Sequence, residues 1–461
     1  MTALMWQSCS SSYPDTAYVP GGEGNQNKED YETYPMSPSL NFNSLLYATS
    51  SGADEMNNPA NGDNTESKAI TPIDKEDEGP LDPQNNWDNF LKRYAKARFY
   101  LLAYRKSVLT NSTSVLGTQP DYTQLMSDDA DRQNCLLSTE RKYISGPDQH
   151  VGKLAIPQGA NKDGDTYSLA TNGALYLLEN AGWETDDDAK RAYNEKTYYW
   201  NWKKFENVGY DFFAYYVNKA QIYGFERQKD CVKIDLELNG KNDIMVGYAP
   251  EVTDSMLRAD YATSITEDSI RTNILAKGDG VYSTYGAVHS VEPKINLKHA
   301  LAYLKFRAKL MDEGVKVSIQ DVQLKAMTRG KLTVAARDYS QLGISDLSDE
   351  KSISIGAYLS EKEISVDEFK NIGEGLLVPP ADSYVVRVLV QQRNVKTEVS
   401  DVNPNGILNQ WLEITCSPEK GFEAGKIYVL DLSVYGSTEV IINSDLEAWK
   451  SGIGTRIDLY E

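Results

Sequence analysis

The feature that most constrains the fold of this chain is the recurrence of short segments in which apolar and polar residues alternate. In CVKIDLEL (231–238), apolar residues at the even positions alternate with charged residues, which is the pattern of a strand with one buried face. ARFYLLAYR (97–105) and YDFFAYYV (210–217) are apolar on both faces, as is typical of central strands. A period of two, repeated along the chain, predicts a β-rich protein with few short helices.

More segments of this kind follow beyond residue 310, separated by turn residues. They are VKVSIQDVQLKA, GKLTVAA, SYVVRVLVQQ, QWLEITC, KIYVLDLSV and TEVIIN. Many short strands without intervening helices are typical of antiparallel Greek-key β-sandwiches, and the two halves of the chain can each form one. An Asn-Gly-Lys sequence at 239–241 predicts a hairpin turn that joins 231–238 to the strand NDIMVGYA (242–249).

The segment INLKHALAYLKFRAKL (295–310) has a break in its alternation. Apolar residues occupy odd positions at its start and even positions from Ala300 onward, so the phase changes near Lys298–His299. This change predicts a β-bulge at that point, with a structural role for the histidine. Leucines in the same segment also fit helical spacing, but we favour a strand because the alternation continues over most of its length.

The distribution of polar sequence predicts three regions. Residues 1–39 form a polar tether with the remnant of a signal sequence, 40–291 a first β-sandwich and 292–461 a second. Within the first sandwich, an early strand at 40–48 is separated from the body by a polar linker at 51–88. A normal domain seldom isolates a strand in this way. The first strand therefore has the sequence context of a removable element.

The composition argues against several classes of function. The formal net charge is −20 and no basic cluster is visible, which disfavours nucleic acid as a partner. The 3 histidines are scattered and the 4 cysteines form no CxxC pair, so we expect no metal site and no cofactor. Nucleophile-elbow, phosphate-loop, dinucleotide-binding and zinc-protease motifs are absent, and we expect no enzymatic activity.

Cys9 follows a short apolar run, ALMW, and precedes a serine-rich stretch. The residues around it leave three roles open: a free thiol, half of a disulfide, or a lipid attachment site. The apolar run is shorter than that of a complete signal peptide, which a longer segment upstream of Met1 would supply.

Aromatic residues are concentrated in TYYWNWKKF (197–205), which includes Trp200 and Trp202. If exposed, these two side chains would form a sugar-stacking platform or a protein contact. If buried, they are part of a core, which is the interpretation that we favour.

Taken in order, several of these segments resemble the fimbrillin superfamily of Bacteroidetes, the subunits and anchors of type V pili. The resemblance rests on the early cysteine with its polar tether, SLNFNSLLYATS, ESKAITP, the YYWNW and YDFFAYYV segments, NDIMVGYA, VEPKINLKHALAYLKFRAKL, AGKIYVLDLSVYG and VIINSDLEAWKSG. It covers most of residues 40–453.

The resemblance implies two tandem transthyretin-like Greek-key sandwiches with a structural or adhesive role. It implies export as a lipoprotein with lipid on Cys9, an outer-membrane or cell-surface location, and cleavage after the first strand at Lys68, where lysine replaces the more usual arginine. The groove so opened would accept a donor strand from another fimbrillin subunit. The resemblance implies two further partners. Before cleavage, the lipid anchor would hold the chain in the outer membrane, and a receptor on a host or bacterial surface would be the second partner.

The C-terminal segment TRIDLYE alternates charged and apolar residues, namely Arg456, Ile457, Asp458 and Leu459. It is a candidate donor strand, and an ordinary last strand of the second sandwich is an equally good interpretation. The alternative function for the whole protein is a cell-surface glycan-binding lipoprotein that uses Trp200 and Trp202.

Overall fold

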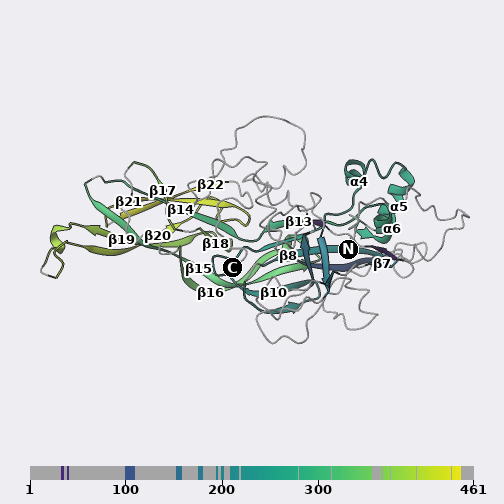
Figure 1. The fold of residues 1–461 in the computed structure, drawn as a ribbon, viewed down its shortest axis with the longest axis horizontal. Coiled ribbons are helices and arrows are strands. Elements are labelled where there is room, and N and C mark those ends of the chain that lie inside the picture. The colour runs from purple at the N-terminus through teal and green to yellow at the C-terminus, as the bar shows by residue number, and fades with distance from the viewer. Residues whose placement is uncertain are drawn as a thin grey trace, which may run out of the picture.

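The computed structural model describes residues 33–35, 39–40, 99–108, 152–157, 175–179, 194–195, 199–201, 208–217, 220–278, 280–312, 314–355, 364, 367–373, 375–400, 402–437 and 439–447. This part of the chain is mostly β, with sheets of nine, six, five and two strands and three short α-helices. Figure 1 shows an elongated body with the helices near one end and the C-terminal strands at the other. The β-rich class is confirmed, and the transthyretin-like tandem topology stays a prediction.

The nine-stranded sheet lies beneath the helices. Its order is β2 (Ser39–Leu40), β13 (Lys294–His299), β11 (Met245–Tyr248), β8 (Val208–Tyr216), β3 (Phe99–Val108), β4 (Lys153–Pro157), β5 (Leu175–Glu179) and β6 (Asn194–Glu195), and β12 (Tyr282–Ser283) also pairs with β8. The described side chains of β3 and β8 are buried on both faces, which confirms that the two-sided apolar segments are central strands.

The six-stranded sheet is built around an unusually long strand. Its order is β20 (Leu408–Cys416), β19 (Tyr384–Arg393), β15 (Lys316–Ala336), β10 (Cys231–Glu237) and β9 (Ile222–Arg227), with β16 (Gly343–Ser354) also pairing with β15. The first half of β15 pairs with β19 and its second half with β10, while β16 pairs with the middle of β15 along the opposite edge of that strand. One sheet is therefore shared by both halves of the body.

The continuity of β15 corrects the expectation of two separate strands at 315–326 and 330–336. Gly330 lies inside the strand, and a Cβ atom there would come within 3.1–3.2 Å of the side chains of Leu347, Ile344 and Leu238. A glycine often ends a strand, whereas here it lets neighbouring side chains pack closely over the strand.

The five-stranded sheet covers the far half of the shared sheet. It contains β17 (Lys370–Asn371), β14 (Ala302–Leu310), β21 (Ile427–Tyr435), β22 (Glu439–Glu447) and β18 (Leu376–Val378). The remaining elements are the pair β1 (Thr33–Pro35) and β7 (Tyr199–Asn201), and two short 3₁₀ helices, η4 (Tyr339–Gln341) and η5 (Lys396–Glu398).

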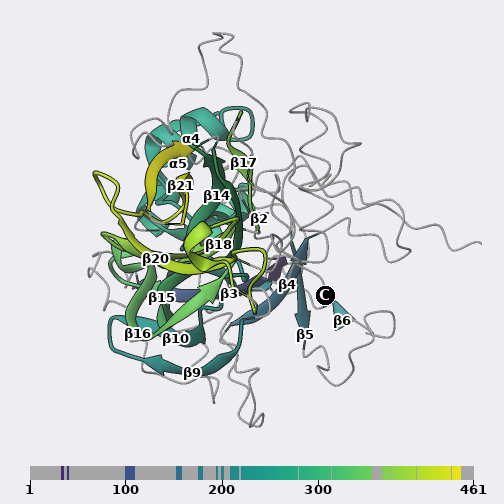
Figure 2. The same ribbon diagram turned by 90° about the vertical axis from the view of Figure 1, so that its left-hand side faces the viewer.

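Three apolar cores hold these layers together. The first lies between the nine-stranded sheet and helices α4 (Asp254–Asp260), α5 (Asp268–Gly278) and α6 (Thr284–Val288). The second lies between the nine- and six-stranded sheets, and the third between the six- and five-stranded sheets. Figure 2, seen along the long axis, shows α4 and α5 on the opposite side of the body from β9 and β10. No helix in these described residues is long and apolar enough to cross a membrane.

The structure also corrects two predicted connections. The segments 231–238 and 242–249 do not form a hairpin, because β10 belongs to the six-stranded sheet and β11 to the nine-stranded one. Likewise, 295–310 is not one bulged strand: β13 ends at His299 and β14 begins at Ala302 in another sheet. The change of phase near 298–299 is real, but it marks a crossing between sheets.

Candidate assembly edge

The nine-stranded sheet begins with β2, a strand of two described residues that runs parallel to β13. Ser39 lies opposite Lys294 and Leu40 opposite Ile295, and the Ser39 amide donates to the carbonyl of Pro293 at 2.9 Å. The Leu40 side chain is 1% exposed and belongs to the same core as Ile295. A fully buried core residue is thus supplied at the edge of the sheet by a segment far upstream in the sequence.

On its other side, β13 is held very closely by β11. Gly247 of β11 lies opposite Leu297, and a Cβ atom at Gly247 would come 1.9 Å from the carbonyl oxygen of Asn296. No side chain fits at that distance, so glycine is required for this pairing. The position of β13 is therefore fixed by its neighbour on the inner side of the sheet.

The end of β13 is fixed by a buried polar pair. His299 Nδ1 lies 2.9 Å from Asp243 Oδ1, and the two side chains are 2% and 4% exposed. Asp243 precedes β11 where the chain crosses from the six- to the nine-stranded sheet, and His299 lies where it leaves for the five-stranded sheet. The pair joins these two crossings, which is a structural role of the kind that the sequence predicts for His299.

A second edge, β16, has features that oppose pairing with another strand. Its residues 346–352 are exposed, and they include charged side chains. Asp346 and Asp349 have φ angles of 49° and 59°, and the pairing with β15 shifts between Arg329 and Lys331. Charges and irregular backbone are the usual means by which sheet edges avoid unwanted pairing.

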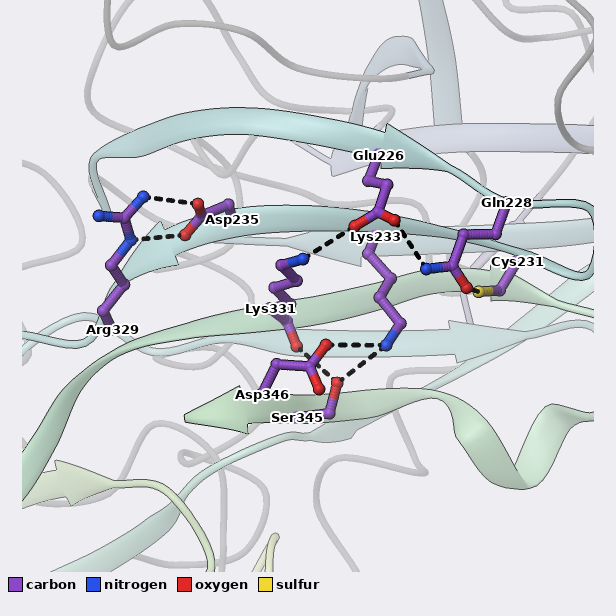
Figure 3. A network of polar contacts seen from close by, with 9 residues as sticks. All are labelled: Glu226, Gln228, Cys231, Lys233, Asp235, Arg329, Lys331, Ser345 and Asp346. Carbon is purple, nitrogen blue, oxygen red and sulfur yellow. Dashed lines mark hydrogen bonds and ion pairs between the residues drawn. The ribbon is translucent and has the colours of Figure 1, made fainter. Parts of the chain in front are cut away.

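The outer face of the shared sheet carries a network of charges that neutralise one another (Figure 3). Asp235 accepts two hydrogen bonds from Arg329, at 2.9 and 2.7 Å. Further along the same strands, Lys331 of β15 donates to Glu226 of β9 at 2.8 Å. Lys233 of β10 donates to Asp346 of β16 at 3.0 Å.

The network also shifts the pKa of one of its acidic groups, Glu226. The hydrogen bond from Lys331, with a smaller contribution from Gln228, holds the pKa of Glu226 below its ordinary value. A carboxylate held in its charged form in this way is a poor proton donor or acceptor near neutral pH. The network therefore fits a solvent-facing surface, where it helps to fix the register of four strands.

The two described cysteines are buried thiols. Burial raises the pKa of both Cys231 and Cys416, which keeps them protonated and unreactive.

Most site residues predicted from the sequence lie outside the described residues. This applies to Cys9, Lys68, Trp202 and Arg456–Leu459, and to the linker at 51–88. Trp200 lies in β7, with Tyr34 opposite it in β1. Their assigned roles stay predictions.

The sequence predicts a strand at 40–48 but does not identify β13 as its neighbour. The pairing joins residues about 250 positions apart, and no local pattern reports it. One local signal was available. Ile295 and Leu297 are buried and occupy odd positions, whereas the apolar residues from Ala300 onward occupy even positions, which indicates that the two segments bury different faces.

Comparison with known proteins gives distant structural matches. No protein-family model and no curated protein matches the sequence. A solved structure from Bacteroides uniformis, described as a candidate cell adhesion protein, matches with 11% identity and a TM-score of 0.33, over 91% of this chain and 99% of that one. A similarly described Bacteroides fragilis protein matches with 11% identity and a TM-score of 0.32, over 90% and 98%.

A third match is a tip fimbrial protein from Porphyromonas gingivalis that was truncated at its C-terminus. It shares 7% identity and a TM-score of 0.27, over 77% of this chain and 94% of that one. The three matched proteins come from Bacteroides and Porphyromonas species and are described as candidate cell adhesion proteins or as a tip fimbrial protein.

Proposed function

We propose that this protein is a fimbrillin-like pilus subunit with a structural and adhesive role, assembled by donor-strand exchange at the edge of β13. The observation that carries the proposal is Leu40, a core residue that is 1% exposed yet is supplied by the two-residue edge strand β2. Removal of β2 would uncover the backbone of β13 at Lys294 and Ile295 together with the apolar site that Leu40 fills.

An uncovered edge of this kind favours pairing with another strand. Unpaired backbone groups and an exposed apolar site are both unfavourable in water, and an added strand satisfies both at once. The β16 edge is charged and irregular, whereas β13 has a regular backbone and inward-facing apolar residues. The edge of β13 is therefore the better acceptor of the two.

The donor in this proposal is the C-terminal segment that contains Arg456–Leu459. Its residues Ile457 and Leu459 alternate with charged residues, so one face of the strand can fill the site of Leu40 while the other faces water. Cleavage at Lys68 would release the first strand. Lipid on Cys9 would hold the chain at the outer membrane before that cut.

The test compares the full chain with a variant that lacks residues 1–68. We expect the truncated protein to bind a peptide of residues 438–461, or to form dimers and polymers, while the full chain stays monomeric. Light scattering measures the assembly and calorimetry measures the peptide binding. A matched control peptide carries Ile457→Asp and Leu459→Asp, and we expect it to bind at least about tenfold more weakly.

Donor-strand assembly would lose its support if the truncated protein were a well-behaved monomer that binds neither peptide. Mass analysis and N-terminal sequencing of the mature surface protein test the remaining parts of the proposal. The expected results are a lipid mass on Cys9 in the uncut, membrane-bound precursor and a new N-terminus at Ala69 in the mature protein.

A further inference from the structure

The second half of the shared sheet exposes one large aromatic side chain, Trp411, on its outer face. The side chain is 37% exposed and lies in the middle of β20. The guanidinium carbon of Arg387 lies 4.7 Å from the centroid of the Trp411 ring. The Nε atom of Arg387 is itself buried. The guanidinium therefore lies against one face of the ring, while more than a third of the side chain stays exposed to solvent.

The Trp411 ring is held in place by this stacking. Arg387 is fixed in turn by Glu413, whose Oε1 lies 2.9 Å from Arg387 Nε, and Lys325 lies 3.4 Å from the same carboxylate. An aromatic ring supported in this way loses little side-chain freedom when a ligand stacks on it, and this favours binding.

Polar groups lie on both sides of the ring along β20. Asn409 precedes Trp411 on the same face of the strand, and Gln391 Nε2 donates to Asn409 Oδ1 at 3.0 Å at an exposed position. That hydrogen bond leaves the Asn409 amide nitrogen as a donor and the Gln391 carbonyl oxygen as an acceptor. Glu413, on the other side of the ring, adds carboxylate acceptors.

The charges around Trp411 balance. Arg387 and Lys325 are positive, while Glu413 and Asp321 are negative and lie on the same face of the sheet. A charged partner would gain little at such a surface, so charge complementarity favours a neutral ligand.

The surroundings of Trp411 also argue against a protein partner. Among the described residues of β15, β19 and β20, it is the one large hydrophobic side chain that is well exposed. Stable protein interfaces bury on the order of 800 Å² per partner around an apolar centre, which this face does not offer. A single ring between hydrogen-bonding groups instead suits a ligand that has both C–H faces and hydroxyl groups.

We propose that this surface binds a neutral glycan. The C–H face of a pyranose ring stacks on Trp411, since those hydrogens are partially positive and the face of an aromatic ring is negative. Asn409, Gln391 and Glu413 hydrogen-bond the sugar hydroxyls. This site lies in the six-stranded sheet and the assembly edge in the nine-stranded sheet, so glycan binding does not depend on strand exchange.

The experiment measures binding of the full chain to dextran, mannan and arabinogalactan by isothermal titration calorimetry, with polygalacturonate as a charged comparator. We expect at least one neutral polysaccharide to bind, and Trp411→Ala to weaken that binding by about tenfold or more. Trp411→Phe keeps a flat ring and is expected to retain part of the affinity. Asn409→Ala is expected to weaken binding while leaving the ring in place.

Tyr435→Ala is the matched control, because Tyr435 is also 37% exposed but lies at the end of β21 in a different sheet. This control is expected to bind as the native chain does. The proposal is overturned if no neutral polysaccharide binds, if polygalacturonate binds more tightly than all of them, or if Trp411→Ala and Tyr435→Ala have equal effects. None of these outcomes affects the strand-exchange proposal, which is read from assembly and peptide binding.

Discussion

His289 is a buried titratable residue directly after helix α6. It is 9% exposed, its amide donates to the carbonyl of Gly286 at 2.9 Å, and its ring packs against Tyr285 with the centroids 4.9 Å apart. Burial lowers the pKa of His289 below its ordinary value. The folded state therefore favours the neutral ring.

This gives a prediction for acid conditions. As the pH falls below about 6.5, the unfolded chain takes up a proton at His289 before the folded chain does. The free energy of unfolding should therefore decrease as the pH falls through the lowered pKa of the folded state. His289→Phe keeps a ring against Tyr285 and removes the titration.

Urea unfolding at about pH 7.5 and 5.5 measures the effect, because an ordinary histidine titrates between these values. The native chain should lose more stability over this interval than His289→Phe does. Carboxylates and His299 are present in both proteins, so the difference between them isolates His289. Equal losses in the two proteins would contradict the prediction.

At the scale of elements, the pairing of β11 with β13 depends on Gly247. A Cβ atom there would come 1.9 Å from the Asn296 carbonyl oxygen, which is backbone and cannot rotate away. We expect Gly247→Ala to lower the free energy of unfolding by about 3 kcal/mol or more, because the two strands must separate to admit the methyl group. Urea denaturation measures the change.

Gly224 in β9 provides the matched control. It also lies within a strand, but a Cβ atom there would meet nothing within 4 Å. Gly224→Ala is expected to change the stability by only about 0.5 kcal/mol, and alanine is the better strand residue of the two. Similar losses for the two substitutions would show that the contact with Asn296 is not the cause.

At the scale of the whole molecule, the shared sheet predicts cooperative unfolding. β15 pairs with β10 in one half of the body and with β19 in the other, and the core between the larger sheets also includes Leu377 and Ile427 from the second half. Separating the halves would break β15 and open that core. We therefore expect one thermal transition, in contrast to the independent melting of domains joined by a flexible linker.

Val388→Ala tests this coupling from the second half. Val388 is 0% exposed in the core between the six- and five-stranded sheets, and its truncation should cost about 2 kcal/mol. Hydrogen exchange should then accelerate by the same factor for amides of β8 in the first half and of β21 in the second. Acceleration confined to β21, or two calorimetric transitions, would show that the halves unfold separately.

Much of the secondary structure follows from the sequence, because alternation reports how each strand is buried. Val232, Ile234 and Leu236 are fully buried and Lys233 and Asp235 are not, as their spacing predicts. The apolar faces of β3 and β8 likewise identify them as central strands. These results depend on residues two positions apart and need no knowledge of the partner strand.

Alternation does not report which strand lies alongside. The sequence predicted a hairpin between β10 and β11 and a bulged strand at 295–310, and both were wrong because each depends on which sheet a segment joins. It also predicted separate strands at 315–326 and 330–336, which are one strand, β15. The candidate assembly edge depends on such a pairing too, between Leu40 and Ile295.

The sequence by itself determined that this protein is built of strands and which faces of them are buried, since both follow from the local period of two. Only the tertiary structure decided that β15 runs through both halves and that Leu40 completes a core at the edge of β13. Many strands have the same local pattern, so the pattern does not identify a partner. The pairing of strands hundreds of residues apart is therefore decided by how whole sheets pack together.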